Sequence, residues 1–348
     1  MRTALPSHED DPRSDAHRRR WSGRTDASRR APAIVRALLA ISNVYRRLLA
    51  AILGVVGPRA AYAIMGPLAR LLYRLFDPFR LRSEAQCRSA LGGRLPEQDI
   101  HRIAEEGFVH RIWNLTDLML ADRLLHAGTF ERYCRRIPAD CLALLDQARR
   151  QRQPMIFVTA YYGPFDLLPV FLAFNGLRPG VVYRPHPNAA FDAYRSRVRG
   201  RGGCELIPVS EASARLGQIL SAGGAVAIVA DHHVERGGEP ATFLGLPTRV
   251  MRSVGLLAWR YQAAVVVAGI RRVDRAFRFE LVVEDLFWPP DWQDEPDPVV
   301  WITRRYLAGL ERLILVDPSQ YLWAYPRWGE DFLQHLLDEH TSSAAPGF

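Results

Sequence analysis

The chain has 348 residues, a mass of 39.4 kDa and 48% hydrophobic residues, enough apolar surface for one large domain or two small ones. Its four cysteines are scattered without a C-x-x-C pair, which fits a reducing compartment and argues against a disulfide framework and a structural zinc site. The net charge of +9 is unevenly placed, since residues 1–82 carry 16 Arg against 6 Asp and Glu. The remainder sums to about −1, which argues against a nucleic-acid binder, because such a protein carries basic residues across its folded domain.

The first segment, residues 1–31, is polar and rich in Arg, Pro and Ser, with almost nothing to bury. We expect it to be a disordered basic tail. It is not a secretory signal, because no apolar stretch of suitable length precedes a small-residue cleavage site.

Residues 32–82 are apolar and basic together, and their apolar positions recur at helical spacing. Gly57-Pro58 separates two predicted helices, of which the second ends at about Arg74. Arg46-Arg47 interrupts the apolar run before it reaches the roughly 18 residues that a membrane-spanning helix needs. We therefore predict a membrane-associating helical hairpin that meets an anionic membrane surface. The alternative is an ordinary amphipathic pair packed on a soluble domain.

Residues 83–335 are predicted to form one α/β domain with a mostly parallel sheet flanked by helices, followed by a flexible tail at 336–348. Its first part is helical, with a start signal at Pro96-Glu97-Gln98-Asp99 and another helix over Pro138–Arg150. The predicted strands are Met155–Thr159, Val181–Tyr183, Ala225–Ala230, Ala263–Ile270 and Phe277–Val283. The predicted helices between and after them lie near 165–175, 188–200, 210–222, 250–261 and 297–316.

Polar residues follow three of the predicted strands at the point where each strand ends. Tyr161, with Asp166 further on, follows the first strand, Arg184 follows the second, and Asp231 follows the third. In a parallel sheet the carboxyl ends of the strands share one edge, where ligands and chemistry collect. The sequence therefore predicts a functional site that contains these side chains.

Several short motifs lie in this domain. In chain order they are Tyr161 with Gly163, Phe165 and Asp166, then Tyr183-Arg184-Pro185 with Asn188, Asp231-His232-His233, Gly237-Gly238, Phe243-Leu244-Gly245, and Tyr321-Leu322-Trp323-Ala324-Tyr325-Pro326-Arg327-Trp328. Together these motifs resemble the bacterial lipid A late acyltransferases, the lauroyl/myristoyl transferase family. Gly163, Phe165 and Asp166 fit the frame of the family's His, four residues and an acidic residue, and Tyr161 stands at the His position. Asp231-His232-His233 stands at the family's Asp-Gln-Asp, and the last segment stands at its Trp-Leu-Trp-Leu-His-Arg-Arg-Trp.

The resemblance implies a glycerolipid acyltransferase-like fold and the transfer of a fatty acyl group from a thioester to a hydroxyl of a phosphorylated glycolipid. Tyr161 and Asp166 would occupy the catalytic positions, and Arg184 would hold anionic groups of the acceptor through paired hydrogen bonds. The implied substrate-binding positions are Gly163, Arg184, Asp231, His232, Arg236 and Phe243.

Tyr161 leaves the identity of the base open. A phenol with a pKa near 10 costs roughly 4 kcal/mol to ionise at pH 7. In one interpretation another group is the base, either Asp166 itself or one of His232 and His233. In a second, Tyr161 is an adapted catalyst, and in a third the chain is inactive and binds lipid without turnover.

Metal binding by His232-His233 is disfavoured, because adjacent side chains on an extended segment point to opposite faces. The aromatic residues near the carboxyl end, Trp323, Tyr325 and Trp328, are typical of core packing. The alternative is that they form an interfacial aromatic belt with Trp288 and Trp292.

The resemblance thus implies a membrane-associated acyltransferase at the cytoplasmic face of the bacterial inner membrane. It would use an acyl carrier protein or acyl-CoA thioester as co-substrate, need no cofactor or metal, and act on a lipid A-like or other phosphorylated lipid. The alternative is a catalytically inactive homologue that binds membrane lipid.

Overall fold

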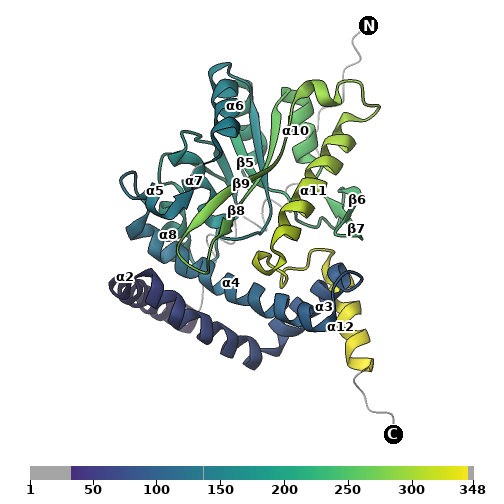
Figure 1. The fold of residues 1–348 in the computed structure, drawn as a ribbon. Helices are drawn as coiled ribbons and strands as arrows, with labels where there is room; N and C mark the ends of the chain where they lie inside the picture. Colours follow the sequence, from purple (N-terminus) through teal and green to yellow (C-terminus); the bar gives the residue numbers. More distant parts are fainter. Residues whose placement is uncertain (1–32, 136, 344–348) are drawn as a thin grey trace.

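The computed structural model describes residues 33–135 and 137–343 of the chain, and within these the fold is α/β (Figure 1). One sheet has seven strands in the order β1-β9-β8-β2-β5-β3-β4, and β6 pairs with β7 in a separate hairpin. The strands of the large sheet are β1 (Cys134–Arg135), β2 (Met155–Thr159), β3 (Gly180–Tyr183), β4 (Glu205–Pro208), β5 (Ala225–Val229), β8 (Ala264–Arg272) and β9 (Phe279–Phe287). The hairpin consists of β6 (Glu239–Phe243) and β7 (Leu246–Val250).

Helices surround this sheet and precede it in the chain (Figure 1). The longer ones are α2 (Ala33–Leu75), α3 (Asp77–Leu91), α4 (Glu97–Leu124), α6 (Ala139–Arg150), α8 (Ala189–Arg199), α9 (Ala212–Ser221), α10 (Ser253–Tyr261), α11 (Pro298–Val316) and α12 (Glu330–Ser343). The shorter ones are α5 (Phe130–Tyr133), η1 (Phe165–Leu167), α7 (Leu168–Phe174), η2 (Pro289–Trp292) and η3 (Pro318–Gln320).

The centre of the sheet is parallel, as the alternation of strands and helices predicts. β2 pairs in parallel with β5 and β8, β3 pairs in parallel with β5 and β4, and only the β8–β9 pairing is antiparallel in the large sheet. All five predicted strands form. β1, β4, β6 and β7 were not predicted. β1 has only two residues, β4 is a four-residue edge strand, and Pro240 and Pro247 argue against strands at β6 and β7.

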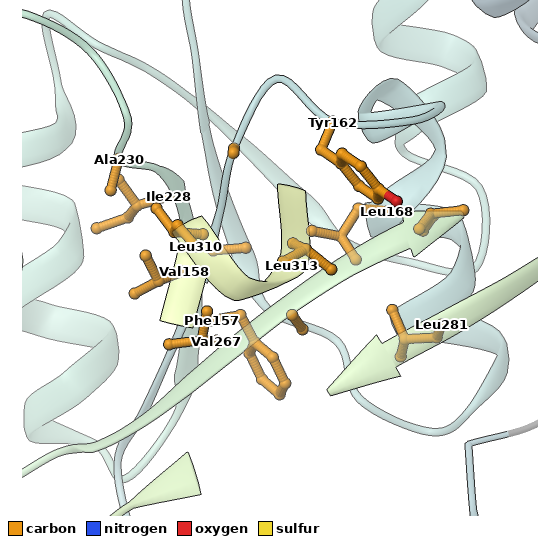
Figure 2. Close-up of a cluster of buried hydrophobic side chains, with 14 of the residues drawn as sticks. Phe157, Val158, Tyr162, Leu168, Ile228, Ala230, Val267, Leu281, Leu310 and Leu313 are labelled. Atoms are coloured by element: carbon orange, nitrogen blue, oxygen red, sulfur yellow. The ribbon is translucent and has the colours of Figure 1, made fainter. Parts of the chain in front are cut away.

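The core lies where α11 packs on the central strands (Figure 2). Leu310 and Leu313 of α11 lie over side chains of β2 and β8, including Phe157 and Val267. A Cβ on Gly269 would approach the Leu313 side chain to 2.6 Å, so this glycine lets the helix lie close to the sheet. Burial of β2 on both faces explains its uninterrupted apolar sequence.

α2 is interrupted at Gly57, whose φ of 79° and ψ of 169° are not helical, as the Gly57-Pro58 pair predicts. After this break α2 packs on α4, and Tyr62 of α2 donates a hydrogen bond to Asp117 of α4. Arg272 of β8 also pairs with Asp117, and both of these side chains are fully buried. The three residues therefore join α2, α4 and the sheet into one body.

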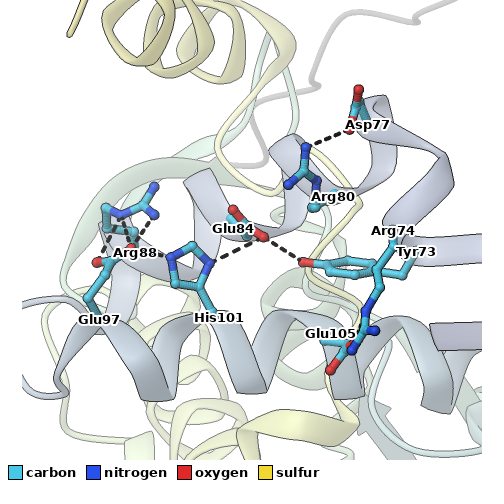
Figure 3. Close-up of polar contacts among 9 residues, drawn as sticks. All are labelled: Tyr73, Arg74, Asp77, Arg80, Glu84, Arg88, Glu97, His101 and Glu105. Carbon is cyan, nitrogen blue, oxygen red and sulfur yellow. Dashed lines mark hydrogen bonds and ion pairs between the residues drawn. The ribbon is translucent and has the colours of Figure 1, made fainter. Parts of the chain in front are cut away.

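Polar contacts also join the end of α2 to α3 and α4 (Figure 3). The Tyr73 hydroxyl donates to Glu84 Oε1 at 3.2 Å, and His101 Nδ1 of α4 lies 3.3 Å from the same oxygen. α3 continues to Leu91, so the domain boundary that we placed at residue 82 falls inside a helix.

The predicted basic tail, residues 1–31, lies outside the described residues. At the other end α12 continues to Ser343, so residues 336–343 of the expected flexible tail are helical. In the described part of the chain no helix combines the length and apolarity that crossing a membrane requires.

We predict that Asp117→Asn lowers the free energy of unfolding by about 3–5 kcal/mol, because it leaves the buried Arg272 guanidinium without a counter-charge. Urea denaturation followed by circular dichroism measures the change. Glu205→Gln is the control, since it removes one partner of the exposed ion pair with Arg215, and we expect no measurable shift of the midpoint. Equal midpoints for Asp117→Asn and the wild type would show that the pair does not hold α2 and α4 to the sheet.

Candidate active site

The carboxyl ends of β2, β5 and β3, which are adjacent in the sheet, bring three predicted side chains to one edge. Tyr161 follows β2, Asp231 follows β5 and Arg184 follows β3. Arg184 is exposed. Burial lowers the pKa of His232 and raises that of Tyr325, and the Arg184 charge adds to the first change and opposes the second. The edge predicted from strand direction is thus present.

A segment near the carboxyl end of the chain crosses this edge and extends β2. The Leu322 N–H donates to the Tyr161 carbonyl at 3.0 Å, and the Gly163 N–H donates to the Gln320 carbonyl at 2.9 Å. Tyr162 and Tyr321 form an antiparallel bridge between these bonds. The segment therefore delivers its own tyrosines and Arg327 to the site.

Asp231 is the polar centre of the site and is 2% exposed. Its Oδ2 accepts hydrogen bonds from the Tyr161 N–H at 3.1 Å and from the Tyr321 hydroxyl at 3.0 Å. The same oxygen lies 3.0 Å from Nη1 of Arg327. Asp231 was predicted to bind substrate. In the structure it is buried in this ion pair, and its contacts connect the ends of β2 and β5 to the segment that carries Tyr321 and Arg327.

Arg327 is also 2% exposed, and aromatic rings surround its guanidinium. Its Cζ lies 4.4 Å from the ring centre of Tyr325, 5.1 Å from that of Tyr321 and 5.3 Å from that of Tyr161. The π faces of the rings stabilise a cation in this position. Arg327 therefore balances the Asp231 charge and fixes the three rings.

The Tyr161 hydroxyl lies 3.0 Å from Nε2 of His232, and both side chains are half-buried. Burial raises the pKa of Tyr161 to about 12, and the Asp231 carboxylate adds to this rise while Arg327 opposes it. Burial lowers the pKa of His232 from its ordinary value of 6.5, although the Asp231 carboxylate opposes that change. At neutral pH the pair is thus a phenol beside a neutral imidazole.

Asp166, expected to be the partner of Tyr161, points instead at α8. It accepts hydrogen bonds from Nη2 of Arg195 at 3.1 and 3.3 Å and from Nη2 of Arg199. Burial alone would raise the pKa of Asp166, but the two guanidiniums hold it below 3.8. A carboxylate that is ionised and paired in this way is a weak proton acceptor, so the hydrogen-bonded pair at the site is Tyr161 with His232.

The remaining predicted residues serve the fold or lie close to the β6–β7 hairpin in the chain. Gly163 has a φ of +52°, and a Cβ there would lie 1.9 Å from the Ile270 carbonyl, so only glycine fits this turn. Phe243 is 1% exposed in the core, so its side chain cannot contact a substrate in this conformation. Arg236 is exposed in the loop before β6, and His233 Nδ1 lies 3.2 Å from Thr248 Oγ1 of β7.

Sequence reasoning did not assign a role to Arg327, Arg195 or Arg199. The motif that ends at Trp328 contains Arg327, but nothing local shows that Asp231 is its partner. Arg195 and Arg199 are four positions apart on α8 and therefore lie on one helix face, a spacing that could have indicated a shared acidic partner.

Within the described residues no group of three or more His, Cys, Asp or Glu side chains has the arrangement of a metal site. His232 and His233 turn in different directions, the former to Tyr161 and the latter to Thr248. The edge of the sheet thus carries a hydrogen bond between a phenol and an imidazole.

The family model described as bacterial lipid A biosynthesis acyltransferase matches residues 48–330, which include α3, the whole sheet, the hairpin and the segment that carries Arg327. No curated protein matches the chain.

We predict that Asp166→Asn lowers the free energy of unfolding by about 1.5–3 kcal/mol at pH 7, because the ion pairs with Arg195 and Arg199 are lost. The folded-state pKa of Asp166 lies below its unfolded value of 3.8, so this stabilisation is present above pH 3.8 and is lost as the pH falls through the folded-state pKa. The difference between wild type and variant should therefore shrink below pH 3.8. Urea denaturation across this range measures it, and a difference independent of pH would contradict the ion pairing.

Proposed function

The chain belongs to the bacterial lipid A biosynthesis acyltransferase family, and on that premise we propose that it moves a fatty acyl group from a thioester to a hydroxyl of a phosphorylated, lipid A-like acceptor. The donor would be an acyl carrier protein or coenzyme A thioester. The observation that carries the proposal is the family match over residues 48–330 together with the Tyr161–His232 pair at the sheet edge. The reaction needs only these two substrates and no cofactor.

An exposed arginine, Arg184, supplies the recognition that such an acceptor requires. Arg184 follows β3 beside the Tyr161–His232 pair, and its charge acts on His232 and Tyr325. Guanidinium groups bind phosphate through paired hydrogen bonds. We assign Arg184, with Arg236 in the neighbouring loop, to the anionic groups of the acceptor.

An exposed apolar stripe on α2 supports a position at the membrane surface. Ile64, Leu68, Leu71 and Leu75 recur at intervals of four, three and four residues, and their exposures are 54, 39, 54 and 66%. The opposite face of the same helix is buried against α4 through residues such as Tyr62 and Tyr73. One apolar face of α2 therefore packs on the protein core, and the second apolar face is free to contact another apolar medium.

We propose that the exposed apolar face of α2 contacts an anionic lipid bilayer, because residues 1–82 carry a net charge of +10. Arg59 and Arg74 are exposed on the same stretch of α2 and would meet lipid head groups. In this proposal residues 32–82 lie against the cytoplasmic face of the inner membrane, where thioester donors are available.

A second function, lipid binding without turnover, is favoured by one observation. Asp166 is held in ion pairs with Arg195 and Arg199 and does not orient Tyr161. A homologue that had lost its catalytic pair would keep the acceptor site and the membrane face while transferring nothing.

We predict that bacteria lacking this chain lose a lipid species that is heavier by one fatty acyl group, as measured by mass spectrometry of lipid extracts. Restoring the wild-type chain should restore the species. Restoring Arg184→Ala should give it at a rate lower by roughly 10-fold or more, because a bidentate anion contact is lost. Arg260→Ala removes an exposed arginine of α10 and should match the wild type. The acyltransferase proposal would be contradicted if lipid profiles were identical with and without the chain and the purified protein transferred no acyl group from either thioester. That outcome would support lipid binding without turnover.

We also predict that replacing Leu68, Leu71 and Leu75 together by Ser reduces binding to anionic vesicles by roughly 100-fold or more, since each buried leucine contributes about 1 kcal/mol or more. The loss should persist at high salt, where electrostatic attraction is screened. Leu144, Leu256 and Leu315, which are 48, 43 and 36% exposed on α6, α10 and α11, provide a matched triple Ser control that should bind like the wild type. Sedimentation with vesicles measures both, and equal binding by the two triple variants would remove the α2 stripe from the membrane contact.

A further inference from the structure

The Tyr161 hydroxyl and the His232 imidazole form a directed pair across two neighbouring strands. β2 and β5 are paired in register from Met155 to Thr159, so the residues that follow them emerge side by side. The ring centres of Tyr161 and His232 are 4.9 Å apart with an interplanar angle of 70°, and Oη lies 3.0 Å from Nε2. These contacts require the sheet, because the two residues are 71 positions apart in sequence.

The second ring nitrogen of His232 fixes the direction of the hydrogen bond. Nδ1 lies 3.2 Å from the carbonyl oxygen of Val229, which only accepts hydrogen bonds, so Nδ1 carries the proton. In the neutral ring Nε2 is then the unprotonated nitrogen. The Tyr161 hydroxyl therefore donates to Nε2, and Nε2 is ready to take its proton.

We propose that His232 is the general base of the transfer and that it acts through the Tyr161 hydroxyl, which contacts the acceptor. This assignment rests on the proposed acyltransferase function and names the group that takes the proton in it. Tyr161 is then the catalytic residue that contacts the substrate, and Nε2 of His232 accepts the proton that Tyr161 gives up.

The transfer balances without any further reactant. The acceptor hydroxyl oxygen bonds to the thioester carbonyl carbon while its proton passes to Tyr161 Oη and the Tyr161 proton passes to His232 Nε2. The C–S bond then breaks, and the proton returns from the imidazolium through Tyr161 to the thiolate. The products are an ester, a free thiol and the original state of the pair.

The surroundings suit the two ends of this relay. With its pKa near 12, Tyr161 stays a phenol at neutral pH, so it passes a proton rather than storing a negative charge. Burial lowers the pKa of His232, but the buried Asp231 carboxylate next to it opposes this change and so favours the imidazolium that forms during the transfer. Nη1 of Arg327 lies 3.0 Å from the Asp231 carboxylate, and its guanidinium carbon lies 5.3 Å from the centre of the Tyr161 ring.

Transfer by the purified full chain from an acyl thioester tests the relay, with the acylated lipid product measured over pH 5–9. His232→Gln keeps an acceptor for the Tyr161 hydroxyl but cannot take its proton, and Tyr161→Phe keeps the ring without the hydroxyl. We expect each variant to lose roughly 10²–10⁴-fold in rate. Wild-type activity should fall on the acid side as His232 becomes protonated below 6.5, and this limb should be absent in His232→Gln.

A third variant, His232→Ala, separates a base from a merely structural residue. It leaves space for added imidazole, which should restore part of the rate, whereas the same imidazole should not help Tyr161→Phe. His233→Gln changes the neighbouring histidine, whose ring contacts Thr248, and should leave the pH profile unchanged. Thermal melting checks that all four variants are folded.

The outcomes separate this inference from the function on which it rests. An active wild type with a rate and an acid limb that His232→Gln does not alter would overturn the relay and leave the acyltransferase function standing. The same holds if His233→Gln, rather than His232→Gln, removes the acid limb. No transfer by the wild type from either thioester would overturn the proposed function and the relay together.

Discussion

The buried ion pair between Asp231 and Arg327 holds the site together. Its Nη1–Oδ2 distance is 3.0 Å, and Arg327 also donates to the Asp231 backbone carbonyl at 2.7 Å. Charges removed from water need partners close by, and besides Arg327 the Asp231 Oδ2 accepts hydrogen bonds from the Tyr161 N–H and the Tyr321 hydroxyl. The end of β5, the end of β2 and the carboxyl-terminal segment are therefore fixed by one carboxylate oxygen.

A second set of contacts links this edge to the amino-terminal helices. Gln86 of α3 donates to the Trp323 carbonyl at 2.5 Å and accepts from the Arg327 N–H at 2.8 Å. Asn114 of α4 donates to the Gly163 carbonyl at 2.7 Å and accepts from Arg272 at 2.9 Å. Because Tyr62 of α2 joins Asp117 and Arg272, the proposed membrane face and the site belong to one continuous hydrogen-bonded body.

Much of the fold is predictable because its determinants are local. The apolar run of β2 is complete within five residues, and Asn188 and Asp297, at the starts of two predicted helices, cap α8 and α11 with their side chains. The β6–β7 hairpin was missed because it carries prolines, and its tip is held from outside, where Glu311 of α11 accepts from the Leu244 N–H at 2.6 Å. A contact of that kind leaves no trace in the local sequence.

The sequence by itself determined that Tyr161, Asp231 and Arg184 meet at one edge, because strand direction follows from the alternation of strands and helices along the chain. Only the tertiary structure decided which side chains become partners. Asp166 is five residues from Tyr161, yet it pairs with Arg195 and Arg199. Two guanidinium cations stabilise a buried carboxylate more strongly than one neutral phenol hydroxyl would. Tyr161 is bonded instead to His232, which the in-register pairing of β2 with β5 brings beside it from a distant part of the chain.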